Sequence, residues 1–187
     1  MSNGSEADAA ETAEPNEMDV AEAIRDGELT SPQRVQNMWL FDLRVTGTGV
    51  SYRPQYNEYT YRNPAHYLNE RFVKRCNGVP VIFEHPQSGE LDTEEYRDRT
   101  IGALILPYQR GDEVWSIARI YDHDAAELMT TSHPSTSPSI KFRPARKIKL
   151  LDGENMLIEG QPDYIDHLAV CPEGVWDKGG EPNGVNA

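Results

Sequence analysis

The sequence contains little cysteine, little positive charge and no long apolar run. Its 2 cysteines, Cys76 and Cys171, are too few for a disulfide framework, so we expect both to pack as small buried hydrophobic residues. No apolar run approaches the roughly 18 residues of a membrane-spanning helix, and no signal-peptide pattern occurs. This predicts a chain that neither crosses a membrane nor is exported by a standard route.

The charge balance argues against a large class of partners. The 187 residues carry 18 lysine and arginine side chains against 31 acidic ones, which gives a net charge of -13. Phosphate groups would be repelled over most of such a surface, so we expect neither nucleic acid nor a membrane as partner. The sequence also lacks a glycine-rich phosphate loop, a Cys-x-x-Cys pair and a dinucleotide fingerprint, so no cofactor is expected.

Residues 1–36 contain no aromatic residue, and their acidic side chains are opposed only by Arg25 and Arg34. A segment of this composition cannot bury enough apolar surface to offset the entropy lost on ordering. We therefore expect an acidic disordered tail over residues 1–36, with at most a short amphipathic helical turn at residues 18–24. Such a tail either keeps the protein in solution or serves as a docking segment for other proteins.

The pattern beyond this tail is that of one folded domain, residues 37–178, followed by a flexible tail at residues 179–187. Residues 38–45 alternate between apolar and other side chains, which predicts a strand. Further apolar runs bounded by turn signals predict strands at residues 79–83, 101–106, 114–121, 135–142, 147–151, 156–159 and 165–171.

Helices are few in this pattern. Asn63-Pro64 is typical of a helix start, and Leu68, Phe72 and Cys76 follow at the spacing of a buried helical stripe. A second short helix is predicted at residues 124–131. Many short strands with few helices predict a β-rich α+β fold, with a single barrel-like antiparallel sheet and a few peripheral helices.

A histidine follows the buried strand predicted at residues 79–83. The segment Val81-Ile-Phe-Glu-His-Pro86 places His85 at the end of an apolar run, and Pro86 favours an extended backbone before it. A histidine at a strand end can reach a pocket, and its imidazole titrates near neutrality, as a general base requires. We predict that His85 is a general base; the alternative is an ordinary surface or capping histidine.

Three serines, Ser135, Ser137 and Ser139, share one face of the strand predicted at residues 135–142. The apolar residues at the end of this strand have the opposite parity and are expected to face the core. All three hydroxyls are therefore candidates for a nucleophile that an imidazole deprotonates. The alternative is a loop rich in serine and threonine that carries no chemistry.

The last predicted strand, residues 165–171, carries His167 next to Leu168. Alternation along the strand places Leu168 in the core and His167 on the opposite face. By the same alternation Asp166 is expected on the wrong side of the strand to share the pocket of His167. The chain thus offers a histidine, a serine and a second histidine, in that order, for the roles of base, nucleophile and orienting partner.

These segments resemble those of the prohead (capsid maturation) serine proteases of tailed phages, which are relatives of the herpesvirus assemblins. The resemblance is carried by Glu84-His85-Pro86, Ser137-Pro-Ser-Ile140 and His167-Leu-Ala-Val170, and it covers roughly residues 38–180. It implies a protease-like domain at residues 37–178 with the barrel-like architecture of that family.

The resemblance also implies a catalytic set of His85, Ser137 and His167. Ser137 fits the family pattern better than Ser139, which stands where the family often has glycine and remains the main rival nucleophile. By resemblance, His167 would orient His85. A neutral imidazole stabilises the imidazolium less than a carboxylate does, so we expect a slow protease. Backbone N–H groups near Ser137, or the side chain of Arg143, would stabilise the oxyanion.

The function implied is a serine endopeptidase that cleaves scaffold and capsid proteins inside the assembling procapsid, in the host cytoplasm. A homodimer is expected by analogy, and neither a metal nor a cofactor is implied. The alternative is a catalytically inactive module of the same fold that binds capsid or scaffold proteins.

Two further patterns are weaker. The segment Tyr121-Asp-His-Asp124, together with His85 and His167, offers the ligand types of a metal-dependent hydrolase, although lone histidines flanked by aspartates more often lie in solvated loops. A run of basic residues is expected to form a solvated face or a rim that attracts acidic substrates; it comprises Lys141, Arg143, Arg146, Lys147 and Lys149.

Overall fold

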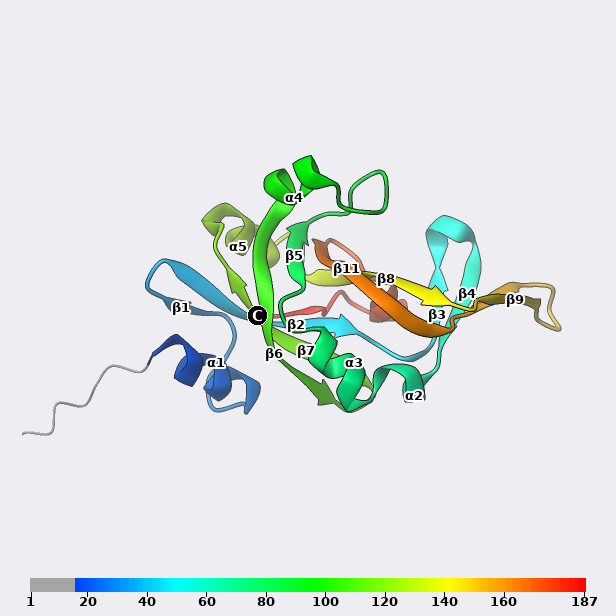
Figure 1. Cartoon of the computed structure of the whole chain (residues 1–187), viewed down its shortest axis with the longest axis horizontal. Coiled ribbons are helices and arrows are strands. Elements are labelled where there is room, and N and C mark those ends of the chain that lie inside the picture. The colour runs from blue at the N-terminus through cyan, green and yellow to red at the C-terminus, as the bar shows by residue number, and fades with distance from the viewer. Residues whose placement is uncertain (1–15) are drawn as a thin grey trace, which may run out of the picture.

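A computed structural model describes residues 16–187 and has a strand-rich α+β fold, as predicted. Within this range the strands form an 8-stranded main sheet and a 4-stranded second sheet (Figure 1). The main sheet has the order β1 (Gln33–Val35), β2 (Met38–Thr46), β7 (Glu113–Ile120), β6 (Thr100–Arg110), β5 (Pro80–Phe83), β11 (Gln161–Cys171) and β8 (Ser135–Arg143). The short strand β12 (Val185–Asn186) pairs with β2.

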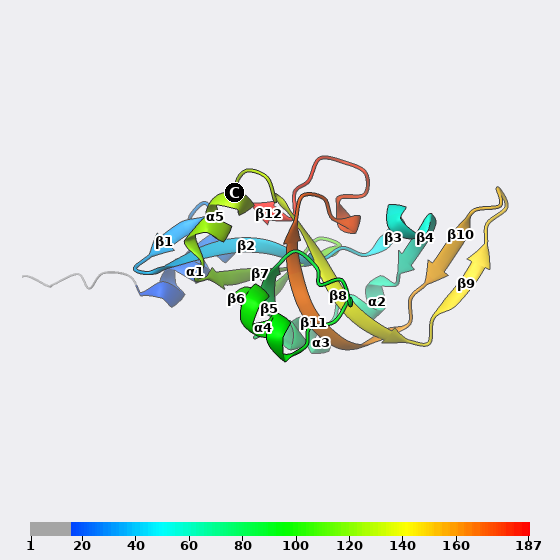
Figure 2. The same cartoon turned by 90° about the horizontal axis from the view of Figure 1, so that it is seen from above.

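The second sheet lies at one end of the molecule, beyond the ends of β8 and β11 (Figure 2). Its order is β3 (Gly49–Arg53), β4 (Glu58–Arg62), β10 (Asn155–Ile158) and β9 (Arg146–Lys149). β3 follows β2 closely in the chain, and β9 follows β8, so two strands of the main sheet lead directly into the second. The second sheet forms part of the cleft described below.

The main sheet is neither closed into a barrel nor wholly antiparallel, which corrects this part of the sequence prediction. Closure would require β8 to pair with β2. Instead β12 pairs with β2, and a backbone hydrogen bond of 3.0 Å from Val185 N to Pro134 O reaches only the residue before β8. Because β8 then runs toward the second sheet, its ladder within residues 16–187 is with β11 alone.

For residues 16–36, the helix α1 (Glu17–Arg25) corrects the prediction of a disordered tail, which allowed at most a helical turn at residues 18–24. The side chain of Asn16 caps this helix by accepting hydrogen bonds from two backbone N–H groups of its first turn. Ala21 and Ile24 are buried in a small core cluster with residues of β2 and β7. The composition of this segment underestimated its tendency to fold, because a narrow apolar stripe is enough to stabilise a helix that packs on a sheet. Residues 1–15 lie outside the described residues.

The carboxyl end is also more ordered than expected. Residues 179–187 were predicted to be a flexible tail, yet Val185 and Asn186 extend the edge of β2. The side chain of Asn183 accepts a hydrogen bond of 2.6 Å from Arg44. Backbone pairing and a buried side-chain contact hold this segment, and neither is visible in its polar, glycine-rich composition.

The remaining helices lie around the main sheet: α2 (Pro64–Tyr67), α3 (Glu70–Arg75), α4 (Thr93–Arg99) and α5 (His123–Met129). Two 3-10 turns, η1 (Pro54–Tyr56) and η2 (Val175–Asp177), complete the fold. The helix predicted to start at Asn63-Pro64 is interrupted at Leu68, where the backbone leaves helical geometry. No helix in residues 16–187 is long and apolar enough to cross a membrane.

The main core lies between the sheet and these helices. Tyr67 and Phe72 pack edge to face with ring centroids 4.8 Å apart, and both are buried in this core. Cys76 joins them and partly buried Leu68 packs against this core, so the predicted stripe faces the core although Leu68 lies outside α3. Cys76 and Cys171 are both free and buried, which confirms the prediction for the two cysteines.

Candidate active site

β11 lies between β5 and β8 and thereby brings together the three segments that the sequence singled out. It pairs in parallel with β5 and antiparallel with β8. In the ladder with β8, Ser137 lies beside Ala169 and Ser139 beside His167. The strand that carries His167 is therefore flanked by the strand that leads to His85 and the strand that carries the serines.

His85 and His167 are in direct contact although 82 residues separate them in the chain. His85 Nδ1 lies 2.8 Å from His167 Nε2, and the ring centroids are 5.0 Å apart. Nε2 of His85 makes no hydrogen bond to any residue within 16–187, and His85 lines the cleft described below. The arrangement leaves one nitrogen of His85 available for a substrate or a nucleophile.

The backbone conformation of Glu84 turns the chain between β5 and His85. Glu84 has a φ of 56°, in the left-handed region that residues with a side chain seldom occupy. Its N–H donates to the carbonyl of Val170 at 3.1 Å, and its carboxylate lies 3.0 Å from Nε2 of His133. The His133 ring packs against Phe83, with centroids 4.4 Å apart. These contacts hold the residue before the candidate base in its unusual conformation.

Asp166 contacts His167, which corrects the prediction that the two side chains lie on opposite sides of the strand. Asp166 Oδ2 is 2.7 Å from His167 Nδ1. The ladder with β8 has a register shift between Ile165 and His167, and such an irregularity allows neighbouring side chains to approach one face. Asp166, His167 and His85 therefore form a continuous hydrogen-bonded chain.

Burial makes this chain electrostatically unusual. The side chain of His167 is 0% exposed and that of Asp166 is 5% exposed. Desolvation lowers the pKa of His167, although the hydrogen bond to Asp166 opposes the shift. Desolvation and then the proximity of His167 lower the pKa of His85 to about 4. Both imidazoles are therefore neutral near pH 7, and a neutral imidazole can accept a proton.

The three serines of β8 have different hydrogen-bond partners. Ser135 is buried, and its hydroxyl donates to the carboxylate of Asp177. The hydroxyl of Ser139 donates to the carbonyl of Gly89 at 3.2 Å. Within residues 16–187, the hydroxyl of Ser137 makes no hydrogen bond, and none joins it to His85 in this structure. Ser135 is thus excluded as a free nucleophile, and Ser137 has the least engaged hydroxyl.

A cleft of about 650 Å³ is lined by His85, Ser137 and Ser139. Residues 85–89 line it from the loop after β5, and residues 137–142 line it from β8. Further lining residues come from the second sheet, from the segments next to its strands and from η2: Arg53, Gln55, Tyr56, Thr60, Arg62, Glu159, Val175 and Trp176. The candidate base and both candidate nucleophiles therefore share one solvent-accessible space.

Arg143 is not among the residues that line this cleft, contrary to the suggested role at the oxyanion. Its guanidinium is 2.5 Å from the carboxylate of Asp163, and its side chain is 85% exposed. Arg53 and Arg62 line the cleft instead, although neither was singled out from the sequence. Arg53 lies over the Tyr56 ring at 4.0 Å and 3.6 Å from a carboxylate oxygen of Glu58.

Arg62 is at the centre of a buried polar cluster behind the cleft. Its guanidinium contacts both carboxylate oxygens of Glu159, at 2.5 Å and 3.0 Å, and also the hydroxyl of Thr46. Tyr67 and Thr60 each donate to Glu159 at 3.1 Å. A charge pair satisfied in this way is well placed to hold β4 and the β10–β11 connection together. Its partners are distant in sequence, so no local motif could have revealed it.

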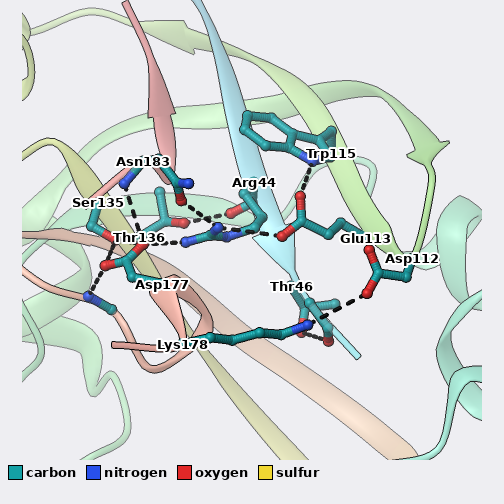
Figure 3. Close-up of polar contacts among 12 residues, drawn as sticks. Arg44, Thr46, Asp112, Glu113, Trp115, Ser135, Thr136, Asp177, Lys178 and Asn183 are labelled. Atoms are coloured by element: carbon teal, nitrogen blue, oxygen red, sulfur yellow. Dashed lines mark hydrogen bonds and ion pairs between the residues drawn. The ribbon is translucent and has the colours of Figure 1, made fainter. Parts of the chain in front are cut away.

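A second buried network anchors the start of β8 (Figure 3). Arg44 of β2 forms an ion pair with Asp177 of η2, and both side chains are nearly fully buried. Ser135 donates to Asp177 at 2.7 Å, and Thr136 donates to the carbonyl of Arg44 at 2.6 Å. Gly174 N also donates to Asp177 at 2.7 Å. The residues immediately before Ser137 are therefore fixed by contacts from several chain segments.

The other sequence candidates take part in local contacts. His123 accepts a hydrogen bond of 3.2 Å from Trp39, and Asp122 caps helix α5. In residues 16–187 no group of three His, Cys, Asp or Glu side chains is arranged to hold a metal ion. Members of the basic run are exposed and form ion pairs: Lys141 with Glu90, Arg143 with Asp163 and Lys147 with the buried carboxylate of Glu58.

Comparison with known proteins identifies no similar sequence or structure. No family model matches the chain, and neither the curated proteins nor the solved structures contain a significant match. The functional interpretation therefore depends on the geometry of the cleft and on the resemblance of the short segments that line it.

Proposed function

We propose that the chain is a serine endopeptidase of the kind that matures phage capsids, with a fold related to that of the herpesvirus proteases. The observation that carries the proposal is the 2.8 Å contact between His85 and His167 at a cleft that also presents Ser137. Segments that resemble the catalytic segments of prohead proteases lie on adjacent strands around one space. That convergence supports a shared chemical role.

In the proposed reaction Ser137 is the nucleophile and His85 the general base. As Ser137 Oγ attacks the carbonyl carbon of the scissile peptide, its proton passes to His85 Nε2. His85 then gives this proton to the leaving amine as the C–N bond breaks. Water attacks the resulting ester with the help of the same base and releases Ser137. His167 acts through His85 as a positioning residue.

The hydroxyl of Ser137 must turn toward His85 for the first step, since no hydrogen bond joins them in the free protein. Catalytic hydrogen bonds are often formed only when substrate is bound. Because Arg143 is paired with Asp163 outside the cleft, backbone N–H groups of the segment around Ser137 are the proposed oxyanion donors.

The proposed substrates are scaffold and capsid proteins, cleaved inside the assembling procapsid in the host cytoplasm. A polypeptide in an extended conformation fits a cleft bordered by β8, whose ladder in the described chain is with β11 alone. A homodimer is proposed by analogy with the family. No cofactor, nucleic acid or membrane takes part in the proposed reaction.

A serine-directed phosphonate tests the nucleophile directly. We expect the full-length protein to form an adduct at Ser137, and Ser137→Ala to lose the label to background. Ser139→Ala is the matched control, because Ser139 lies in the same strand and cleft but donates to Gly89. Absence of an adduct in the assembled or dimeric wild-type protein would contradict the proposal, as would a label on Ser139 alone.

The second candidate is a catalytically inactive module that binds capsid or scaffold proteins. The observation that favours it is that Ser137 is not hydrogen-bonded to His85, together with the serine at position 139 where the family often has glycine. Co-expression with the capsid proteins distinguishes the two functions. The peptidase predicts that Ser137→Ala abolishes their processing, whereas the binding module predicts normal processing by both Ser137→Ala and Ser139→Ala.

A further inference from the structure

Asp166 lies behind the histidine pair, in a place where the sequence pattern did not put it. We propose that Asp166 is a positioning residue that sets the tautomer of both His167 and His85 and so leaves His85 Nε2 unprotonated, facing the cleft. The inference deepens the proposed peptidase function and rests on it for its catalytic meaning. The proton positions themselves do not depend on that function.

The argument follows the hydrogen bonds one by one. A carboxylate can only accept, so the contact of 2.7 Å between Asp166 Oδ2 and His167 Nδ1 requires a proton on His167 Nδ1. A neutral imidazole carries one N–H, so His167 Nε2 is an acceptor. The contact of 2.8 Å with His85 then requires a proton on His85 Nδ1. The lone pair of His85 is consequently on Nε2.

Both rings must be neutral for this chain of assignments to hold. Burial lowers the pKa of His167 and of His85, so both are uncharged near pH 7. Other charged groups near His167 are Glu95 and Lys141, and their effects on its pKa oppose each other. Lys141 is paired with Glu90 at 2.6 Å. Asp166 is the charged group that hydrogen-bonds directly to the His167 ring.

Without the carboxylate, the contact between the two histidines would permit the opposite arrangement. His167 could donate from Nε2 to His85 Nδ1, and His85 would then carry its proton on Nε2. In that tautomer His85 has no lone pair facing the cleft and cannot accept a proton from a serine. The buried carboxylate of Asp166 therefore decides, through the His167 ring, whether His85 can act as a base.

Asp166 also connects this chain to the loop that lines the cleft. The same oxygen, Oδ2, accepts a hydrogen bond of 3.0 Å from the N–H of Leu91. The loop that contains Leu91 begins at His85 and includes Gly89, whose carbonyl holds Ser139. Orientation of the rings and placement of the loop thus depend on one side chain. Such double use is typical of groups that support a site.

The first test reads the protons without any assay of activity. In the 15N-histidine-labelled full-length protein at pH 7, NMR correlations between ring nitrogens and ring C–H protons separate protonated from unprotonated nitrogens. The sequence has 5 histidines, which single His→Gln variants assign. We expect both His85 and His167 to be protonated on Nδ1 and unprotonated on Nε2. A proton on His85 Nε2 in the wild-type protein would overturn the proposal.

The second test removes the carboxylate. We expect Asp166→Asn to convert His85 wholly or partly to the Nε2-protonated tautomer and to slow phosphonate labelling of Ser137 by about 10²- to 10⁴-fold. Asp163→Asn is the matched control on the same strand; Asp163 pairs with exposed Arg143, and we expect no change in either readout. An unchanged His85 tautomer in a folded Asp166→Asn variant would contradict the proposal.

The two proposals fail in different ways. If the wild-type protein takes no label while its ring protons follow the expected pattern, the peptidase is wrong and the tautomer assignment holds. If Ser137 is labelled while His85 carries its proton on Nε2, Ser137 remains the nucleophile and the role of Asp166 is wrong. Should Asp166→Asn fail to fold, the wild-type spectrum still decides the assignment.

Discussion

Ser135 and Ser137 lie two residues apart on β8 with the same strand parity, yet their surroundings differ. Ser135 is buried and donates to Asp177, which is itself held by Arg44. Ser137 lines the same cleft as His85 and makes no hydrogen bond within the described chain. Residue type and strand parity are therefore shared, and the hydrogen-bond partner separates a structural serine from a candidate nucleophile.

The comparison also divides β8 into a fixed half, Ser135 and Thr136, and a free half, Ser137–Phe142, which differ in their surroundings. Its first residues are fixed by a network that includes β2 and η2, with the carboxyl-terminal segment bound to Arg44 (Figure 3). From Ser137 to Phe142 the strand lines the cleft. A rigid start followed by an accessible stretch is a suitable arrangement for presenting a side chain to substrate, because the fixed half limits the movement of the free half.

The largest change in stability is expected when Arg44, whose ion pair with Asp177 anchors the start of β8, is removed. Arg44→Leu would leave Asp177 buried without its partner, and we expect a loss of about 3–5 kcal/mol in the free energy of unfolding. Urea denaturation measures it. Arg146→Leu replaces an exposed arginine on β9 and is expected to change stability by no more than about 0.5 kcal/mol. Equal losses in both variants would contradict the anchoring role.

A smaller effect separates the two serines themselves. Ser135→Ala removes a donor to a buried carboxylate, so we expect a loss of about 1–3 kcal/mol. Ser137→Ala breaks no hydrogen bond and is expected to stay within about 0.5 kcal/mol of wild type. Parallel denaturation curves of the two variants provide the measurement. If Ser137→Ala proved as costly as Ser135→Ala, the contrast between the two halves would be lost.

A still smaller effect is expected at Ser139. Ser139→Gly removes the hydrogen bond to Gly89 and restores the small residue that the resembling family often has, at a cost of about 0.5–1.5 kcal/mol. We expect phosphonate labelling of Ser137 to persist. Complete loss of labelling in this variant, with the fold intact, would show instead that the Ser139 hydroxyl takes part in the chemistry.

A gradual loss of stability is expected as the pH falls, because His85 in the cleft is neutral in the folded protein. The pKa of His85 is lowered from its unfolded value to about 4, so the unfolded chain binds more protons between about pH 6.5 and pH 4. The stability associated with neutral His85 is therefore present above about pH 6.5 and decreases as the pH falls toward 4. Unfolding free energies across this range should fall less steeply for His85→Asn. An identical slope in both proteins would contradict the shift.

Sequence patterns predicted which strands carry the candidate residues and that the serines share one parity. They could not separate Ser135 from Ser137, because Asp177 reaches Ser135 from 42 residues away. They also misplaced Asp166, since strict alternation fails at the register shift before His167. Both errors arise from contacts or irregularities that exist only in the folded backbone.

The same limit applies to the fold. Alternating apolar residues identified the long strands, but closure of the sheet depends on which edges meet, and β8 leads into the second sheet instead. The order of α1 depends on burial of Ala21 and Ile24 against β2 and β7. Composition shows how much apolar surface a segment can bury, but it does not show which other elements of the fold will pack against that surface.

The left-handed backbone of Glu84, directly before His85, is accompanied by a contact that lies outside the cleft. Its carboxylate is tied to His133, which lies outside the set of residues that line the cleft. The segment that leads from β5 to His85 is therefore restrained by a side-chain contact with His133 as well as by the backbone hydrogen bond to Val170. A restraint on the approach to His85 is thus placed outside the cleft itself.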